Sequence, residues 1–279
     1  MKKLLLIDGS NLLYQTFYGM SPKRVVGRDG KTVHGTLGFI GAVLKLLRLT
    51  NADYTAVIFA NRHAMPKAEW AQDCRLGKVQ NLLPDESPNS QLSDILRVLT
   101  QLNIRTICMD TADAGNSIAS YAKGYQELAD VIIASFDSRF FQLIDTNISV
   151  LRYRGEHSFI ATPKAFFEKY NILPSQYPDF KALVGDRAYG FEGAEFVKEK
   201  TAVLLLNRLS SLDTICNIAP KISKLGLRES LTCNAKRLLE NRNALLLNPH
   251  PTVPYPLSEL SYTAPQNTTQ EILKALGIM

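Results

Sequence analysis

The chain has 279 residues, of which 46% are hydrophobic and 21% are charged, and it carries a formal net charge of +6. This length accommodates one α/β domain and a smaller second domain, and the composition is that of a globular protein and not of a disordered or fibrous one. The net positive charge favours a polyanionic partner. The ordinary explanation of such a charge, however, is a solvated surface that binds no polyanion.

The N-terminal apolar stretch is too short for a secretory signal, because Asp8 ends it where a signal peptide needs an apolar core of about 7–15 residues. No apolar run approaches the roughly 18 residues of a transmembrane helix. We therefore expect a cytoplasmic protein without a membrane partner. The four cysteines and four histidines lack the spacing of a zinc site or a disulfide framework. No feature of the sequence indicates the oligomeric state.

In the first 160 residues, apolar strands alternate with helices. Short apolar runs predict buried strands at 2–7, 54–59, 104–109, 130–134 and 148–152. Apolar residues at helical spacing predict helices at 34–48, 91–102 and 116–127. This order predicts an α/β fold in which a parallel sheet is flanked by helices.

Beyond residue 160 the pattern becomes helical. Thr162 and Pro163 form an N-cap followed by proline at the first helical position. The predicted helices are 163–169, 174–183, 199–209, 227–244 and 268–277, and a Pro-rich extended stretch lies at 248–266. We therefore divide the chain into domains 1–160 and 161–279.

Aspartates follow several of the predicted strands. Asp8 ends the first strand, Asp113 follows the third, and Asp137 follows the fourth. Asp186 lies beyond the alternating region and reaches the same crevice only through tertiary folding. The functional crevice of a parallel sheet lies beyond the carboxyl ends of its strands, where carboxylates suit hard divalent cations. Asp137 could also act only as a helix cap or turn residue.

Two stretches resemble motifs of the 5′-nuclease family, which includes the 5′–3′ exonuclease domain of DNA polymerase I and the flap endonucleases. Residues 3–11, KLLLIDGSN, resemble its first acidic motif, and residues 181–186, KALVGD, resemble a later one. HGT at 34–36 and KTA at 200–202 resemble further elements in the same order. The resemblance implies a PIN-like, Rossmann-like domain followed by a helix–three-turn–helix region.

In that family, carboxylates hold two divalent ions that flank the scissile phosphate. The resemblance implies that Asp8, Asp113, Asp137 and Asp186 are the remaining catalytic and metal-binding residues. At other positions where the family pattern has a carboxylate, this chain has Ala60, Gly115, Asn116, Arg139 and Tyr189. We therefore expect weak or lost metal binding and impaired cleavage.

Arg139 brings a cation to one of these positions. A guanidinium is always charged and pairs well with carboxylates. If Arg139 points into the crevice, it substitutes for a metal ion beside Asp137, Asp186 or Asp8. The alternative is an outward-facing side chain on the surface.

Residues 60–89 lie where the family has its helical arch, through which a single-stranded 5′ end passes. Lys67, Arg75 and Lys78 match the charge type of that segment's basic positions, and Trp70 between them could stack on a base. An exposed segment of mixed charge is the alternative.

A second candidate nucleic-acid contact lies at Lys198, Lys200 and Thr201. It adjoins the segment 193–198, which resembles the family's Gly-rich turn. Two of the family's glycines are missing there and Glu195 is added, which makes close approach to a duplex backbone harder.

Three functions compete on this evidence. The first is a DNA-binding homologue with impaired or lost cleavage, which needs no cofactor. The second is an active 5′–3′ exonuclease or flap endonuclease that uses the four aspartates with Mg²⁺ or Mn²⁺. The third is a non-enzymatic interaction scaffold. The expected partner is branched or 5′-ended DNA, and RNA offers the same phosphate chemistry. The basic charge favours the first two functions, and the missing carboxylates with Arg139 favour the first over the second.

Overall fold

The chain folds into two compact units in the computed structural model, which describes all residues except 20–24, 28–29, 31, 61–86, 111–113, 251 and 279. The first unit comprises residues 1–137, 151–159 and 249–279, and the second comprises 138–150 and 160–248. Neither unit is continuous in sequence, so the two units do not correspond to a single cut of the chain. The division into domains 1–160 and 161–279 stays a prediction.

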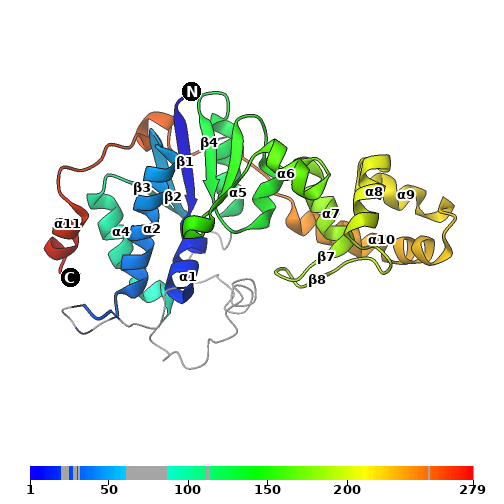
Figure 1. Cartoon of the computed structure of the whole chain (residues 1–279), viewed down its shortest axis with the longest axis horizontal. Helices are drawn as coiled ribbons and strands as arrows, with labels where there is room; N and C mark the ends of the chain where they lie inside the picture. Colours follow the sequence, from blue (N-terminus) through cyan, green and yellow to red (C-terminus); the bar gives the residue numbers. More distant parts are fainter. Residues whose placement is uncertain are drawn as a thin grey trace. The chain divides into compact units, whose positions relative to one another are not determined.

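A six-stranded sheet has the order β3-β2-β1-β4-β5-β6 (Figure 1). Its strands are β1 (Lys3–Asp8), β2 (Tyr54–Phe59), β3 (Arg105–Cys108), β4 (Asp130–Ala134), β5 (Ile148–Arg152) and β6 (Phe159–Ala161). In the centre, β1 runs parallel to both β2 and β4, with Leu4 opposite Tyr54 on one side and Val131 on the other. The five predicted strands are present and β6 is additional, so the predicted parallel sheet is confirmed.

Helices cover both faces of this sheet. In the first unit they are α1 (Gly9–Gly19), α2 (His34–Thr50), α4 (Leu92–Gln101), α5 (Gly115–Tyr125) and α11 (Thr269–Ala275), with short 3₁₀ turns η1 (Pro88–Gln91), η3 (Gly155–His157) and η6 (Leu257–Leu260). Successive side chains of a strand point to opposite faces. Leu5 and Ile7 of β1 accordingly join the apolar cluster with α2, α4 and α11, while α5 contacts β1 and β4.

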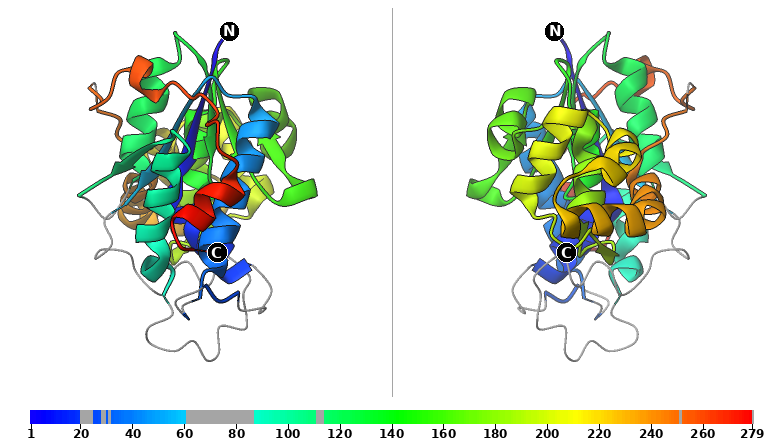
Figure 2. Two further views of the ribbon diagram at one scale, coloured as in Figure 1. Left: turned by 90° about the vertical axis from the view of Figure 1, so that its left-hand side faces the viewer. Right: turned by 90° about the vertical axis from the view of Figure 1, so that its right-hand side faces the viewer.

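The last segment of the chain completes the core of the first unit. Ile272, Leu273 and Ile278 are buried in the same apolar cluster as the inner faces of α2 and α4. Thr268 and Glu271 form a capping box that begins α11. Figure 2 shows α11 beside α2 and α4, far from them in sequence.

The second unit is mainly helical. It contains α6 (Pro163–Tyr170), α7 (Tyr177–Val184), α8 (Glu199–Leu209), α9 (Leu212–Ile218), α10 (Leu225–Leu245), the 3₁₀ turns η2 (Ser138–Leu143), η4 (Pro174–Gln176) and η5 (Ala219–Lys221), and the hairpin strands β7 (Gly185–Asp186) and β8 (Phe191–Glu192). Helix α9, with seven residues, was not among the predicted helices. Its start is fixed locally, since the Ser211 hydroxyl accepts a hydrogen bond from the Thr214 N–H.

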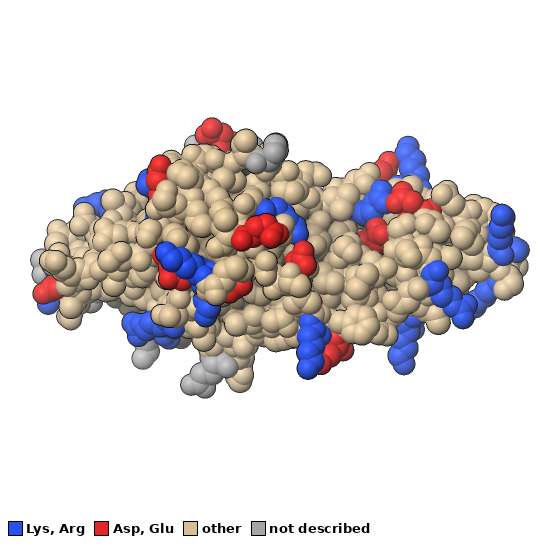
Figure 3. Space-filling view, turned by 90° about the horizontal axis from the view of Figure 1, so that it is seen from above, with Lys and Arg blue, Asp and Glu red and all other residues tan. Residues whose placement is uncertain are grey.

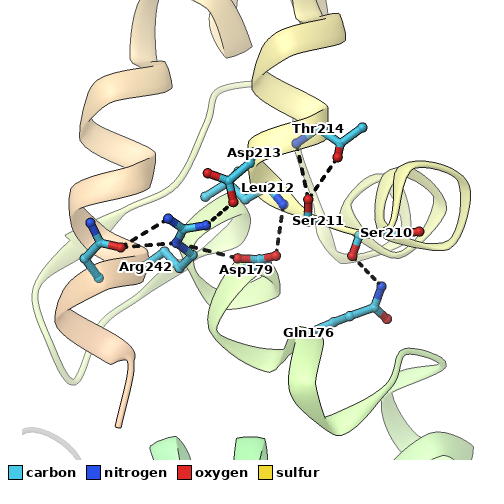
Figure 4. Close-up of polar contacts among 9 residues, drawn as sticks. Gln176, Asp179, Ser210, Ser211, Leu212, Asp213, Thr214 and Arg242 are labelled. Carbon is cyan, nitrogen blue, oxygen red and sulfur yellow. Dashed lines mark hydrogen bonds and ion pairs between the residues drawn. The ribbon is translucent and has the colours of Figure 1, made fainter. Parts of the chain in front are cut away.

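An ionic network joins three helices of the second unit (Figure 4). Arg242 of α10 forms ion pairs with Asp179 of α7, at 4.0 Å, and with Asp213 of α9. The Asp179 carboxylate also accepts the Leu212 N–H at 2.9 Å. Burial raises the pKa of Asp179, so its charge is costly there and the Arg242 guanidinium offsets part of that cost.

Among the residues that the structure describes, no helix has the length and apolar character needed to cross a lipid bilayer.

Candidate active site

Asp8 occupies the carboxyl end of the central strand β1. Its side chain is buried, and one oxygen accepts the Asn11 N–H at 3.0 Å, so Asp8 caps helix α1. The second oxygen accepts the Ser135 hydroxyl at 2.7 Å. The chain thus uses Asp8 to join β1, α1 and the end of β4.

Asp137 lies at the same edge of the sheet, as the sequence predicted. Its backbone N–H donates to the Ser135 hydroxyl oxygen at 3.0 Å, and this hydroxyl donates to Asp8. The preceding Phe136 is flanked by two cations, with the guanidinium carbons of Arg152 and Arg154 lying 5.5 Å and 5.0 Å from its ring centroid. The Asp137 loop of the first unit therefore has two guanidinium groups beside it.

A tight hairpin of the second unit presents Asp186. Gly185 has a φ of +88°, which an L residue rarely adopts. A Cβ atom at Gly193 would lie only 2.4 Å from the Leu183 carbonyl oxygen. Glycine at both positions lets β8 pack against the end of α7, and this holds Asp186 in place.

Both oxygens of Asp186 have partners within the second unit. One accepts the Ala188 N–H at 2.9 Å, and the other lies 3.1 Å from the Lys181 ammonium. The Asp186 side chain is 6% exposed and that of Lys181 is 21% exposed, so water screens this ion pair only partly. Lys181 was not among the predicted site residues, although it belongs to the same KALVGD motif.

Two positions where the family pattern has carboxylates contact each other in the second unit. The Arg139 guanidinium carbon lies 5.3 Å from the centroid of the Tyr189 ring, within the range of a cation–π interaction. The Tyr189 ring in turn stacks on Phe191 of β8, with centroids 5.8 Å apart. The role of Arg139 as a cation substitute beside an aspartate stays a prediction.

The remaining residues singled out in the sequence either lie in or next to regular secondary structure or belong to segments that the structure does not describe. Ala60 is buried directly after β2, and its N–H donates to the Ser10 hydroxyl at 2.9 Å. Gly115 and Asn116 begin helix α5. The predicted Asp113, Lys67, Trp70, Arg75 and Lys78 lie outside the residues that the structure describes.

Metal-ligating side chains do not form a cluster in the part of the chain that the structure describes, since no three His, Cys, Asp or Glu side chains there gather closely enough to hold a metal ion. Both oxygens of Asp8 have protein partners within the first unit, and both oxygens of Asp186 have protein partners within the second.

Basic residues flank the start of helix α8. Lys198 precedes the helix, Lys200 and Thr201 lie in its first turn, and both lysines are exposed. Lys200 also lines a cavity of about 570 Å³ together with Lys169 and Arg208. Figure 3 shows several Lys and Arg side chains projecting at the right-hand end of the view, with Asp and Glu side chains among them. Glu199 lies between the two lysines and lines the same cavity, so the charge at the start of α8 is mixed.

An exposed aromatic residue occupies the segment 193–198. Phe196 has a φ of +63° and is 64% exposed. Bulky residues rarely adopt this left-handed conformation. The sequence analysis noted the missing glycines of this segment but gave no role to Phe196.

Two models of known protein families match this chain and together cover most of it. The model described as the 5′-3′ exonuclease N-terminal resolvase-like domain matches residues 3–171, and that of the 5′-3′ exonuclease C-terminal SAM fold matches residues 172–268. The chain belongs to the 5′-3′ exonuclease family. The predicted family and fold class, a PIN-like α/β domain followed by a helical domain, are thus confirmed.

Relatives of this 5′-3′ exonuclease family member differ in length. Thermostable DNA polymerase I of Thermus thermophilus is 27% identical over 237 residues, which cover 85% of this chain and 28% of the polymerase. The chain thus spans little more than a quarter of the polymerases it matches. A protein named 5′-3′ exonuclease from Buchnera aphidicola is 25% identical over 245 residues, which cover 87% of this chain and 83% of that protein.

Solved structures share the fold. T5 5′-exonuclease with bound divalent zinc ions matches with a TM-score of 0.66 at 17% identity, covering 88% of this chain and 89% of that one. The catalytic core of Rad2 in complex with DNA substrate matches with a TM-score of 0.62 at 15% identity, covering 98% and 87%.

Proposed function

We propose that this 5′-3′ exonuclease family member binds nucleic acid and hydrolyses phosphodiester bonds weakly or not at all. Branched or 5′-ended DNA is its expected ligand. The ion pair between Lys181 and Asp186, at 3.1 Å, carries the proposal. The proposal includes a cytoplasmic location. It also assigns the segment 193–198 and its flanking helices to a helix–three-turn–helix element.

The Lys181 ammonium opposes metal binding at Asp186. A metal ion that used this carboxylate would have to displace an ammonium held on the preceding helix, and the displaced cation would remain close to the metal. Like charges at such distances repel strongly where water is partly excluded. The ion pair therefore weakens the affinity of Asp186 for a divalent cation.

The contact between Arg139 and Tyr189 supports the same conclusion. Neither side chain is a ligand for Mg²⁺, which prefers carboxylate and other oxygen ligands. The two side chains instead contact each other in a cation–π interaction, which stabilises both of them where the family pattern has metal-binding carboxylates. The guanidinium groups beside Phe136 add positive charge near Asp137.

An active nuclease that depends on Mg²⁺ or Mn²⁺ is the second candidate. The hydrogen-bonded chain from Asp8 through Ser135 to the Asp137 backbone favours it, because two of the four predicted ligands lie at one edge of the sheet. The chemistry that a bound metal would supply there is activation of water and stabilisation of charge on the phosphate.

A cleavage assay separates these two candidates. We expect purified protein with Mg²⁺ or Mn²⁺ to cleave a 5′-flap DNA no faster than its Asp8→Asn variant does. Each lost contact to the charge of the transition state costs about 10²- to 10³-fold in rate, so several losses abolish measurable turnover. The Buchnera relative serves as the positive control. Metal-dependent turnover that Asp8→Asn abolishes would establish the second candidate instead.

Binding should depend on the lysines beside helix α8. Replacing Lys198 and Lys200 by alanine should lower the affinity for a 5′-flap DNA and reduce the slope of log affinity against log salt by about two, because each phosphate contact contributes about 0.9. Fluorescence anisotropy over a salt series measures this slope. The matched control replaces Lys164 and Lys236, whose side chains are 87% and 91% exposed on α6 and α10. An equal effect of both pairs would refute a local contact.

A further inference from the structure

Phe196 is held in an unfavourable backbone conformation that its own packing does not explain. Its φ of +63° is one that bulky side chains adopt rarely, and 64% of the residue is exposed. A buried residue can offset such strain through packing, whereas an exposed one gains little. Strained residues of this kind cluster at ligand-binding sites.

The ring lies against the start of helix α10. A Cβ atom at Gly226, in the first turn, would lie 3.4 Å from the Phe196 ring, so glycine leaves the ring room to rest on the helix. The neighbouring Leu225 is 56% exposed. The contact of the Phe196 ring with Gly226 therefore joins two segments distant in sequence, and each segment has an exposed apolar residue.

Exposed Glu195 precedes the ring in the chain, but cations outnumber acids in the segments on either side of the contact with Gly226. Exposed Lys198 follows the ring in the same segment, and Lys221 and Lys224 are exposed just before α10. Between residues 214 and 228 the chain has three cations and no acid. Lys224 cannot cap α10, because a lysine side chain accepts no hydrogen bond, and no acidic residue lies in the first turn. An exposed aromatic ring in segments that also have exposed cations suits a ligand with both flat apolar faces and phosphates.

We infer that Phe196 stacks on an unpaired base, so that the segment 193–198 and the start of α10 bind single-stranded nucleic acid or a frayed end. This inference rests on the proposed nucleic-acid binding and names its ligand class. A base offers its face to an aromatic ring only where it is not already stacked in a duplex. Lys198, Lys221 and Lys224 supply the contacts to the phosphates on either side of that base.

The test compares a single-stranded DNA oligonucleotide with a duplex of the same sequence. Phe196→Asn removes the ring, and asparagine tolerates a left-handed φ. We expect it to weaken single-strand binding about tenfold or more, as loss of a base–aromatic stack does, and to change duplex binding by less than about twofold. The melting temperature should stay the same or rise, because backbone strain is relieved. Phe167→Ala on α6, where the native residue is 47% exposed, is the matched control and should bind like the parent.

A fluorescence experiment gives an independent readout. The chain has one tryptophan, so Phe196→Trp in a Trp70→Phe background places a single reporter in the segment. Its emission should be quenched by the single strand, and that of Phe167→Trp in the same background should not.

The possible failures are distinct. If the parent binds and Phe196→Asn binds the single strand equally well, the stacking inference is overturned while the proposed function stands. If the parent binds no nucleic acid at all, both are overturned. Weakened binding of single strand and duplex to the same extent would contradict the single-strand preference and indicate a general phosphate contact.

Discussion

Replacing Arg139 and Tyr189 together by aspartate should give the protein a strong response to Mn²⁺. In the parent, millimolar Mn²⁺ should barely change the melting temperature, because the Lys181 ammonium already pairs with the Asp186 carboxylate. The double substitution removes the guanidinium and the ring that contact each other and supplies two carboxylates in their place. Without metal, the added carboxylates repel each other, and we expect a lower melting temperature than that of the parent.

The expected size of the metal response follows from mass action. A ligand present at 100 times its dissociation constant stabilises the folded state by about 2.7 kcal/mol. For a protein of this size each kcal/mol corresponds to about 2–4 °C, so the variant should gain about 5–10 °C with Mn²⁺. Differential scanning fluorimetry with and without Mn²⁺ measures it. Arg208→Asp, which makes the same charge change as Arg139→Asp at an exposed residue of α8, is the control.

A large Mn²⁺ shift in the parent, unchanged by the double substitution, would contradict this account. It would mean that the remaining aspartates already bind metal in the presence of Lys181 and Arg139. Lys181→Met then becomes informative, because removing the ammonium should increase the metal response if the ion pair with Asp186 competes with the cation.

Arg242→Ala should destabilise the protein more than any other alanine substitution in an ion pair described above. The substitution leaves Asp179 charged, largely buried and without the guanidinium that pairs with it at 4.0 Å. Removing one partner of a buried ion pair typically costs about 3–5 kcal/mol, and partial exposure of Asp213 brings our expectation to about 2–4 kcal/mol. Urea unfolding at pH 7 measures the loss in the free energy of unfolding.

The pH dependence of this loss has a definite sign. Burial raises the pKa of Asp179 in the folded state, so the folded protein keeps that proton to a higher pH than the unfolded chain does. The charged carboxylate lowers stability above its folded pKa, and protonation removes this cost below its unfolded pKa. The effect of Arg242→Ala should therefore shrink as the pH falls through the pKa of Asp179.

The control for Arg242 lies on the same helix. Lys236 forms an ion pair with Glu240 at 3.9 Å, but the two side chains are 91% and 64% exposed. Exposed pairs contribute at most about 1 kcal/mol, so Lys236→Ala should change stability little. Similar losses for both variants would show that Arg242 acts through helix propensity or packing and not through charge.

Periodicity in the sequence was sufficient to predict the sheet and most of the helices, although not α1. The buried strand that ends at Asp8 and the alternation of strands with helices placed Asp8 and Asp137 at one edge of the sheet, where the structure has them. The elements that escaped prediction include the helices α1 and α9, with 11 and seven residues, and the strands β7 and β8, with two each. A periodic pattern needs more residues than α9, β7 and β8 have to stand out from chance.

The contacts of the candidate site could not be predicted in the same way. The sequence indicated which carboxylates are missing, but not that Lys181 pairs with Asp186 or that Arg139 lies over Tyr189. Such pairings depend on side-chain directions after folding. The pairing of Lys181 with Asp186 had a signal in the sequence, because Lys181 lies only five residues before Asp186, on the helix that leads to it. For the pair of Arg139 and Tyr189, which are distant in sequence, no local pattern exists.

The position of α11 in the first unit has a consequence for biosynthesis. The ribosome completes all of residues 160–248 before it adds the segment that carries Ile272, Leu273 and Ile278. At about 5–20 residues per second, the inner surfaces of α2 and α4 wait roughly 10–30 s for their covering helix. During that interval the nascent chain exposes apolar side chains that the finished protein buries. The first unit therefore folds to completion only after synthesis of the second.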